Sequence, residues 1–205
     1  MTHSRQCFVL AAFWLTALLV GCASPDPKLY TIAAVASAGA DQASAMTKRI
    51  DGANVVVLRQ IGLARYLERP QIVRSSENYQ VDVLANDWWG EPLAAMLSRV
   101  LVEELGQHLP ESVVLGESGA VSAAPDTVVE LNISRLDLDA AGNLILYAQA
   151  SVSSKAQDKP ALESFRFSVR PSAPGVQAQV AAISVAVGQL ADKLAPIIQA
   201  QAARR

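Results

Sequence analysis

Few side chains in this sequence have the type and spacing that catalysis requires. His108 is the only histidine beyond the first 21 residues, so a His–Cys zinc cluster is excluded and a Ser–His–acid triad would have to use it. The segment 116–119, Gly-Glu-Ser-Gly, lacks the five-residue spacing of a nucleophile elbow. Glu103 and Glu104 diverge by about 100° on a predicted helix and cannot flank one substrate. We therefore predict no enzyme, no catalytic residue, no metal site and no cofactor.

The residue with the clearest chemical role is Cys22. It follows Leu19-Val20-Gly21, and an uncharged run at 8–20 precedes it after the positive charge of Arg5. That run suits the apolar region of a secretory signal and is shorter than the roughly 20 residues that cross a bilayer. Small residues before a cysteine fit a peptidase cleft, and the thiol can then take a diacylglycerol. This is the lipobox pattern, so we expect a signal peptide at 1–21 and lipidation of Cys22.

Two other interpretations of Cys22 remain: a buried cysteine after a hydrophobic helix, and a plain secretory signal that is cut elsewhere. If the cysteine is acylated, the lipid anchor is stable, because two chains already suffice to hold a protein on a membrane. Ala23 and Ser24 follow it instead of the aspartate that usually retains such proteins in the inner membrane. We therefore expect the protein to be lipid-anchored on the periplasmic face of an outer membrane.

Composition excludes further classes of protein. The 17 basic residues fall to 16 without Arg5, against 19 acidic residues, which gives the mature chain a formal charge of −3. No clustered basic face is evident, so no nucleic-acid partner is expected. Removal of the signal also removes Cys7 and leaves one cysteine, which excludes an internal disulfide. Residues 22–27, with two prolines, predict a tether, and residues 28–205 predict a single domain.

Two long segments have apolar residues at helical spacing. The first is a helix over about 91–108, with Asn86 and Asp87 as candidate caps at its start. The second begins near Val176 and has the cleanest periodicity of the chain. Because its steps are close to a heptad, it could pack on a sheet or on another helix. The apolar stripes are Leu93, Leu97, Val100, Leu101 and Leu105 in the first helix, and Val176, Val180, Ile183, Val187, Leu190, Leu194 and Ile197 in the second.

The remaining pattern predicts strands. Segments 28–35, 54–61, 79–84 and 112–115 are short candidates, and segment 36–53 is predicted to be a loop or a weak helix. Three alternating strands then follow from Thr127 to Arg170, joined by turns at 140–143 and 155–160. A shift of phase between Ile133 and Leu136 indicates a β-bulge. Together these elements predict an α+β fold, a two-layer sandwich with a mixed or antiparallel sheet of about five to six strands and two main helices on one face.

Two segments are not explained by folding alone: Tyr-Leu-Glu-Arg-Pro-Gln-Ile-Val at 66–73, and Asp-Trp-Trp-Gly-Glu-Pro-Leu at 87–93. Behind a lipobox and about twenty residues apart, they resemble the PqiC-type (YmbA-like) ABC-type transport auxiliary lipoproteins. The resemblance extends over nearly the whole mature chain in the order of its elements. Asp87-Trp88 departs from the Arg-Trp or similar polar–Trp pair of many relatives, so the interface chemistry could differ there.

The resemblance implies a non-enzymatic component of a trans-envelope lipid transport system. Its expected partners are a protein with mammalian-cell-entry (MCE) domains and, in some systems, an ABC permease; self-association into a homo-oligomer stays open. The protein would scaffold the outer end of the complex and support membrane integrity. The alternative is a stand-alone periplasmic lipoprotein that binds a lipid or another ligand in its own pocket. Such a pocket would be lined by residues such as Phe165, Phe167 and the stripe of the last helix.

Six residues are predicted to form the partner-binding surface. An arginine beside a rigid proline turn, together with large aromatic side chains, is typical of an interface. Folding also offers other roles: one tryptophan could pack in the core, Tyr66 could be core or contact, and Arg69 could pair with Glu68 or cap a carbonyl group. The predicted surface consists of Tyr66, Arg69, Pro70, Gln71, Trp88 and Trp89.

Overall fold

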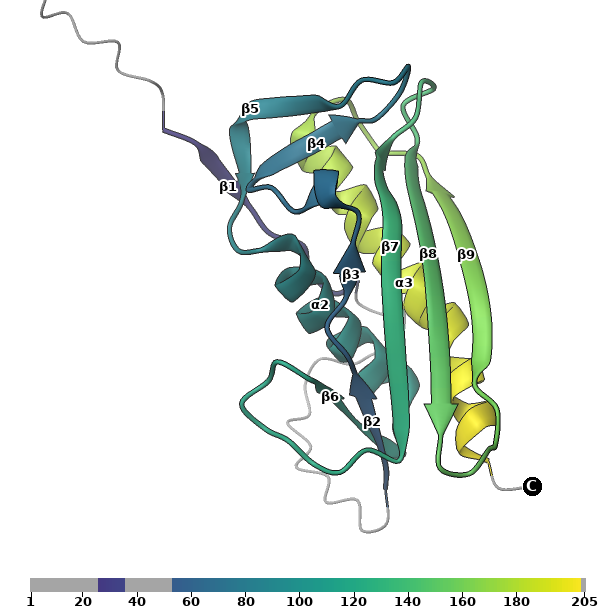
Figure 1. The fold of residues 1–205 in the computed structure, drawn as a ribbon. Helices are drawn as coiled ribbons and strands as arrows, with labels where there is room; N and C mark the ends of the chain where they lie inside the picture. The colour runs from purple at the N-terminus through teal and green to yellow at the C-terminus, as the bar shows by residue number, and fades with distance from the viewer. Residues whose placement is uncertain (1–25, 36–52, 204–205) are drawn as a thin grey trace, which may run out of the picture.

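The computed structural model describes residues 26–35 and 53–203 (Figure 1). The signal peptide predicted at 1–21, Cys22 and nearly all of the predicted loop at 36–53 lie outside these ranges. The described elements are β1 (Lys28–Tyr30), β2 (Asn54–Leu58), β3 (Gly62–Leu63), the 3-10 helix η1 (Arg65–Leu67), β4 (Gln71–Ser75), β5 (Asp82–Trp89), α2 (Leu93–His108), β6 (Ser112–Gly116), β7 (Thr127–Leu138), β8 (Leu144–Ser154), β9 (Ala161–Val169) and α3 (Val176–Ala202).

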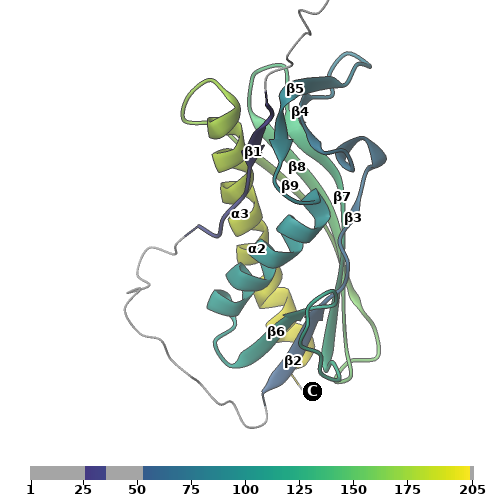
Figure 2. The ribbon, with the colours of Figure 1, turned by 90° about the vertical axis from the view of Figure 1, so that its left-hand side faces the viewer.

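The strands form one mixed sheet, and both helices cover the same face of it (Figure 2). The predicted α+β two-layer class is confirmed, but the sheet has nine strands where five to six were expected. The difference comes from β7, whose twelve residues pair on one side with β8 and on the other with β2, β3 and β4 in turn. Because β3 has only two residues and β4 five, neither shows a clear alternation in the sequence.

The three predicted antiparallel strands are the framework of the sheet. β7 pairs with β8 along its whole length, and β8 pairs with β9 from Leu144 to Val152. The β7–β8 register shifts between Ile133 and Arg135, which confirms the bulge that the change of phase predicted. Gly142 has a φ of 79° in the turn between β7 and β8, a conformation that glycine adopts without strain.

The last helix packs on its own sheet and also on α2. Its predicted stripe faces the interior: Ile183, Val187 and Leu190 are each about 1% exposed. α3 packs mainly on β7, β8 and β9 and on α2. By length and apolar composition α3 could also cross a membrane, but 56% of its most apolar window is buried inside the domain. The two packing modes left open by the sequence are therefore both present within one chain.

The layer between α3 and the sheet is filled by side chains. The rings of Phe165 and Phe167 are stacked, with their centroids 6.2 Å apart, and both pack against the core. These two residues were predicted to line a ligand cavity in the alternative function. Their packing on the core leaves that alternative without a described cavity at this place.

Residues 86–89 are extended, which corrects the predicted start of the first helix. The sequence placed Asn86 and Asp87 as helix caps, whereas both belong to β5, and α2 begins after Pro92. The side chain of Asp87 is used elsewhere, because the Tyr30 hydroxyl donates to its Oδ1 at 2.7 Å. β1 pairs in parallel with this part of β5, in the register Lys28↔Asp87 to Tyr30↔Trp89. Pairing with a strand 57 residues earlier overrides the local capping preference.

Candidate functional site

The two motif segments of the sequence lie side by side in the structure. β4 and β5 pair antiparallel, with Gln71 opposite Trp88, and the amide of Trp89 donates to the carbonyl oxygen of Pro70 at 2.7 Å. Gln71 pairs with Trp88 and Val73 with Val83, so one residue of β4 faces four residues of β5 between these pairs. β5 therefore bulges and bends between Val83 and Trp88. This bend directs the end of β5 back toward Pro70 and brings the two motifs together.

A surface pocket of about 350 Å³ opens where the motifs meet. Its floor is apolar, because Trp89 and Leu93 are only 7% and 5% exposed. Three charged side chains line it, two of them acidic and one basic. An apolar floor with a few polar groups at the edge is the usual form of a binding pocket. The residues that line it are Leu63, Glu68, Arg69, Pro70, Trp89, Glu91, Pro92, Leu93 and Ala94.

Arg69 presents most of its guanidinium group at the edge of the pocket. Its Nε donates to the carbonyl oxygen of Tyr66 at 2.9 Å, so of the two folding roles considered it caps a carbonyl group. Within the described ranges no ion pair joins Arg69 to Glu68. The side chain is exposed, and its remaining N–H groups point to no protein acceptor in that part of the chain. The guanidinium group therefore keeps donors for a bound group.

Glu91, which also lines the pocket, is held in place by α2. It accepts a hydrogen bond from Arg99 of α2 at 2.6 Å, and the side chain of Arg99 also reaches Thr31 at 3.4 Å. The lining therefore includes one guanidinium group with free donors and one carboxylate that is already paired.

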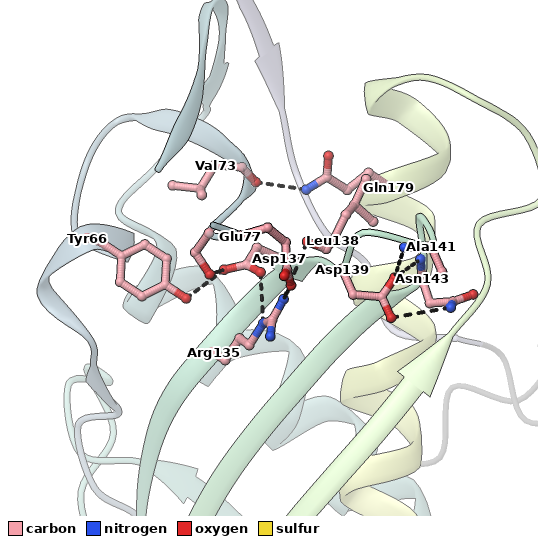
Figure 3. Close-up of polar contacts among 11 residues, drawn as sticks. Tyr66, Val73, Glu77, Arg135, Asp137, Leu138, Asp139, Ala141, Asn143 and Gln179 are labelled. Atoms are coloured by element: carbon pink, nitrogen blue, oxygen red, sulfur yellow. Dashed lines mark hydrogen bonds and ion pairs between the residues drawn. The ribbon is translucent and has the colours of Figure 1, made fainter. Parts of the chain in front are cut away.

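Tyr66 holds the loop before Arg69 on β7 (Figure 3). Its hydroxyl donates to Oδ2 of Asp137 at 2.7 Å, and Asp137 is completely buried. Asp137 also accepts from the hydroxyl of Ser76 at 2.7 Å and from Nε of Arg135 at 2.9 Å. Burial, followed by the bond to Asp137, raises the pKa of Tyr66 well above its ordinary value of 10.0. Tyr66 thus acts as a positioning residue for the edge of the pocket.

The two tryptophans have different environments. Trp89 lies in the core and forms part of the floor of the pocket, as the folding role for one of the pair predicted. Trp88 is partly buried on the other side of the strand, and its indole N–H donates to the carbonyl oxygen of Ala85 at 2.9 Å. Gln71, opposite Trp88, is also partly buried and does not line the pocket. The pocket therefore unites Arg69, Pro70 and Trp89, while Tyr66, Gln71 and Trp88 support it from outside.

Sequence reasoning missed several residues that line the pocket. Leu63 belongs to a two-residue strand without periodicity, so no local signal could indicate it. Pro92, Leu93 and Ala94 belong to the start of α2, and the first two stand within the quoted motif at 87–93. Among the residues that the structure describes, no group of three His, Cys, Asp or Glu side chains could hold a metal ion.

These features define a class of protein: a small two-layer α+β domain with an apolar pocket between a β-hairpin and the start of a helix. The chain belongs to the family of ABC-type transport auxiliary lipoprotein components, whose family model matches residues 30–195. The resemblance stated from the sequence is thereby confirmed. Members of this family are auxiliary components of transport systems, which agrees with the expectation that this protein is not an enzyme.

Solved structures share the fold. One is a crystal structure of an uncharacterized protein, with a TM-score of 0.69 and 15% identity, covering 85% of this chain and 99% of that one. Another is protein XCC0632 from Xanthomonas campestris, of family DUF330, with a TM-score of 0.62 and 17% identity over 85% of this chain and 97% of that one. At these identities the likeness concerns the fold alone. No functionally curated protein matches the chain.

Proposed function

We propose that this protein is an outer-membrane lipoprotein that docks an MCE-domain protein of a trans-envelope lipid transport system. In this proposal residues 1–21 are removed, Cys22 carries the lipid, residues 22–27 are the tether and residues 28–205 are the docking domain. The domain scaffolds the outer end of the complex and supports membrane integrity, and it catalyses no reaction. Its further partners are an ABC permease of the same system and, where self-association occurs, other copies of this chain.

The observation that carries the docking proposal is the pocket formed by Arg69, Pro70 and Trp89. It lies where the two family-like motifs meet, and its apolar floor suits a large apolar side chain of a partner. The exposed guanidinium group of Arg69 can bind a carboxylate or a carbonyl group of the same partner. This combination favours a peptide segment of a protein, with one apolar residue next to an acceptor group.

Two variants test the pocket without removing its core. Ala94→Phe places a ring inside the pocket, and Ala95→Phe places the same ring one helix position away, on an exposed residue that does not line the pocket. Arg69→Glu reverses the charge at the edge, and Arg65→Glu makes the same change at an exposed arginine outside it. Trp89→Ala is less suitable, because loss of a buried tryptophan costs about 3–5 kcal/mol of stability.

The measurement is the affinity of each folded variant for the MCE-domain protein encoded in the same genome. We expect Ala94→Phe and Arg69→Glu to weaken binding about thirtyfold or more, because residues at an interface hot spot contribute about 2 kcal/mol or more. Ala95→Phe and Arg65→Glu should bind as the unmodified protein does. Equal affinity of all four variants would show that the partner binds elsewhere or that there is no such partner.

Anchoring and location have separate tests. The mature N-terminus should carry the mass of three acyl chains on Cys22, and Cys22→Ser should abolish the modification. Density-gradient fractionation should place the native protein with the outer membrane, and recovery in inner-membrane vesicles would refute this location. Stoichiometric phospholipid in the protein purified without its partner would instead support the stand-alone carrier.

A further inference from the structure

One end of the domain gathers the segments closest to the tether. The turn 76–81, the turn 139–143 and the loop 170–175 lie at this end, and the start of β1, which pairs with Asp87 of β5, lies at the same end on the other side of the domain (Figures 1 and 2). The described chain starts at Asp26, and four residues of extended chain from Cys22 span at most about 14 Å. If Cys22 is lipidated as proposed above, this end, which we call the tether end, lies close to the membrane surface.

Tyr79 protrudes from the tether end. It lies in the turn between β4 and β5, its side chain is fully exposed, and its φ of 62° is in the left-handed region. Asn78 before it has a φ of 54°, and Val81 after it is 40% exposed. A tight turn in this conformation favours glycine or asparagine, so a tyrosine is not required by the fold. An amphipathic ring is, however, the side chain that membrane interfaces favour.

A second pocket opens at the tether end, formed mainly by the loop 170–175 and the turn 139–143. Its volume is about 560 Å³, and its described lining contains Arg74 and Arg170 but no carboxylate. Arg74 also pairs with Asp82 at 3.4 Å, whereas Arg170 is exposed and has no ion pair within the described ranges. Gln179, which also lines the pocket, joins α3 to β4: its Nε2 donates to the carbonyl oxygen of Val73 at 2.8 Å (Figure 3).

Two arginines on a concave surface are suited to a phosphate group, because each guanidinium presents paired N–H donors in a plane. The phosphate of a phospholipid headgroup lies at the depth where an interfacial tyrosine lies. The ring of Tyr79 and the arginine pocket are on the same end of the domain, so one approach to a bilayer can engage both.

We propose that the tether end is a membrane-docking surface, on which Tyr79 enters the lipid interface and the pocket of Arg74 and Arg170 binds a phospholipid phosphate. The inference rests on the proposed lipidation of Cys22, which supplies the proximity. Docking would fix the orientation of the domain on the membrane, whereas a tether alone leaves it free to rotate.

Spin labels locate the turn in the lipidated protein. Once Cys22 is acylated it has no free thiol, so Tyr79→Cys supplies a unique site for a nitroxide. The matched control is Leu162→Cys, at a residue that is 72% exposed near the start of β9, at the opposite end of the domain. In vesicles of phosphatidylethanolamine and phosphatidylglycerol we expect the label at 79 to collide more with oxygen than with an aqueous nickel chelate. If the label at 79 collides with the nickel chelate as readily as the label at 162 does, both sites are in water and the proposal is overturned.

Flotation of the mature Cys22→Ser chain with the same vesicles measures docking without the anchor. Removing one arginine charge next to a phospholipid surface should weaken partition about fivefold. We therefore expect this loss for Arg170→Gln and no loss for Lys159→Gln, which changes an exposed lysine in the turn between β8 and β9. Equal partition of the two variants would overturn the proposal.

The failure of this inference and the failure of the proposed function are distinguishable. Mass spectrometry of the native N-terminus reports lipidation by itself, and the affinity for the MCE-domain protein reports the docking pocket by itself. An unmodified Cys22 would refute the anchor whatever the flotation result. A lipidated protein whose label at 79 stays aqueous would refute membrane docking alone.

Discussion

Replacing Tyr66 by phenylalanine removes one hydroxyl from the network around Asp137 and leaves the ring in place. Asp137 is completely buried and then keeps two donors, the hydroxyl of Ser76 at 2.7 Å and Nε of Arg135 at 2.9 Å. A hydrogen bond to a charged group contributes about 1.5–3 kcal/mol. Because two donors remain, we expect the lower part of this range, about 1.5–2 kcal/mol. For a domain of this size that loss lowers Tm by roughly 3–8 °C.

The same substitution has a predicted dependence on pH. The pKa of Tyr66 is raised in the folded protein above its ordinary value of 10.0, chiefly by burial and then by the bond to Asp137. Below pH 10 the tyrosine is protonated in both states, and its contribution to stability is fully present. Above pH 10 the unfolded chain gains by losing the proton, so this contribution declines as the pH rises toward the folded pKa. The difference between the unmodified protein and Tyr66→Phe should therefore shrink above pH 10.

Urea denaturation followed by circular dichroism, at steps between pH 7 and pH 11, measures both effects. Tyr79→Phe is the matched control, since its hydroxyl is on a fully exposed side chain, and it should leave the free energy of unfolding unchanged. Equal stability of Tyr66→Phe and the unmodified protein at pH 7 would refute the energetic role of the bond. A difference that stays constant up to pH 11 would refute the raised pKa.

Three further substitutions test the fold by free energy of unfolding. Gly142→Val should destabilise by about 1–2 kcal/mol, because no atom crowds the position but a φ of 79° disfavours a branched residue; an unchanged value would contradict that conformation. Ile183→Ala should cost about 2–5 kcal/mol, since its side chain is 1% exposed; a loss below 1 kcal/mol would place it outside the core. Pro196→Ala should stabilise by about 2 kcal/mol, because an exposed proline interrupts the hydrogen bonds of α3; a loss of stability would refute this.

Elements with a long repeat were predictable from the sequence because each repeats one burial pattern many times. The stripe of α3 and the alternation of β8 both extend over ten residues or more. Each helical turn or residue pair therefore buries the same face, and the tertiary contacts reinforce the local pattern. Even the bulge near Ile133 was visible as a change of phase. The two-residue β3 was not predictable, since it owes its conformation to partners at 132–133, whereas β1 lies within the strand predicted at 28–35.

The candidate site shows the same division. Arg69, Pro70 and Trp89 were identified from their motifs, but the pocket that joins them depends on the bend of β5 and on the pairing of Trp89 with Pro70. Local sequence favoured a helix cap at Asp87, and only the contact with Tyr30 shows why the segment stays extended. A cap and a strand end use the same residue types, so single-sequence reasoning could not separate them.

One hairpin carries both proposed surfaces, and this restricts the geometry of the complex. β4 leads from the docking pocket at Pro70 to the turn that holds Tyr79, and nine residue steps of extended chain span at most about 30 Å. If Tyr79 enters the lipid interface, the partner that fills the pocket must therefore reach to within roughly that distance of the membrane. A partner that ended much farther away could engage the pocket only when Tyr79 leaves the membrane. The two proposals then predict competition, so that vesicle binding and partner binding weaken each other for a short partner and coexist for a long one.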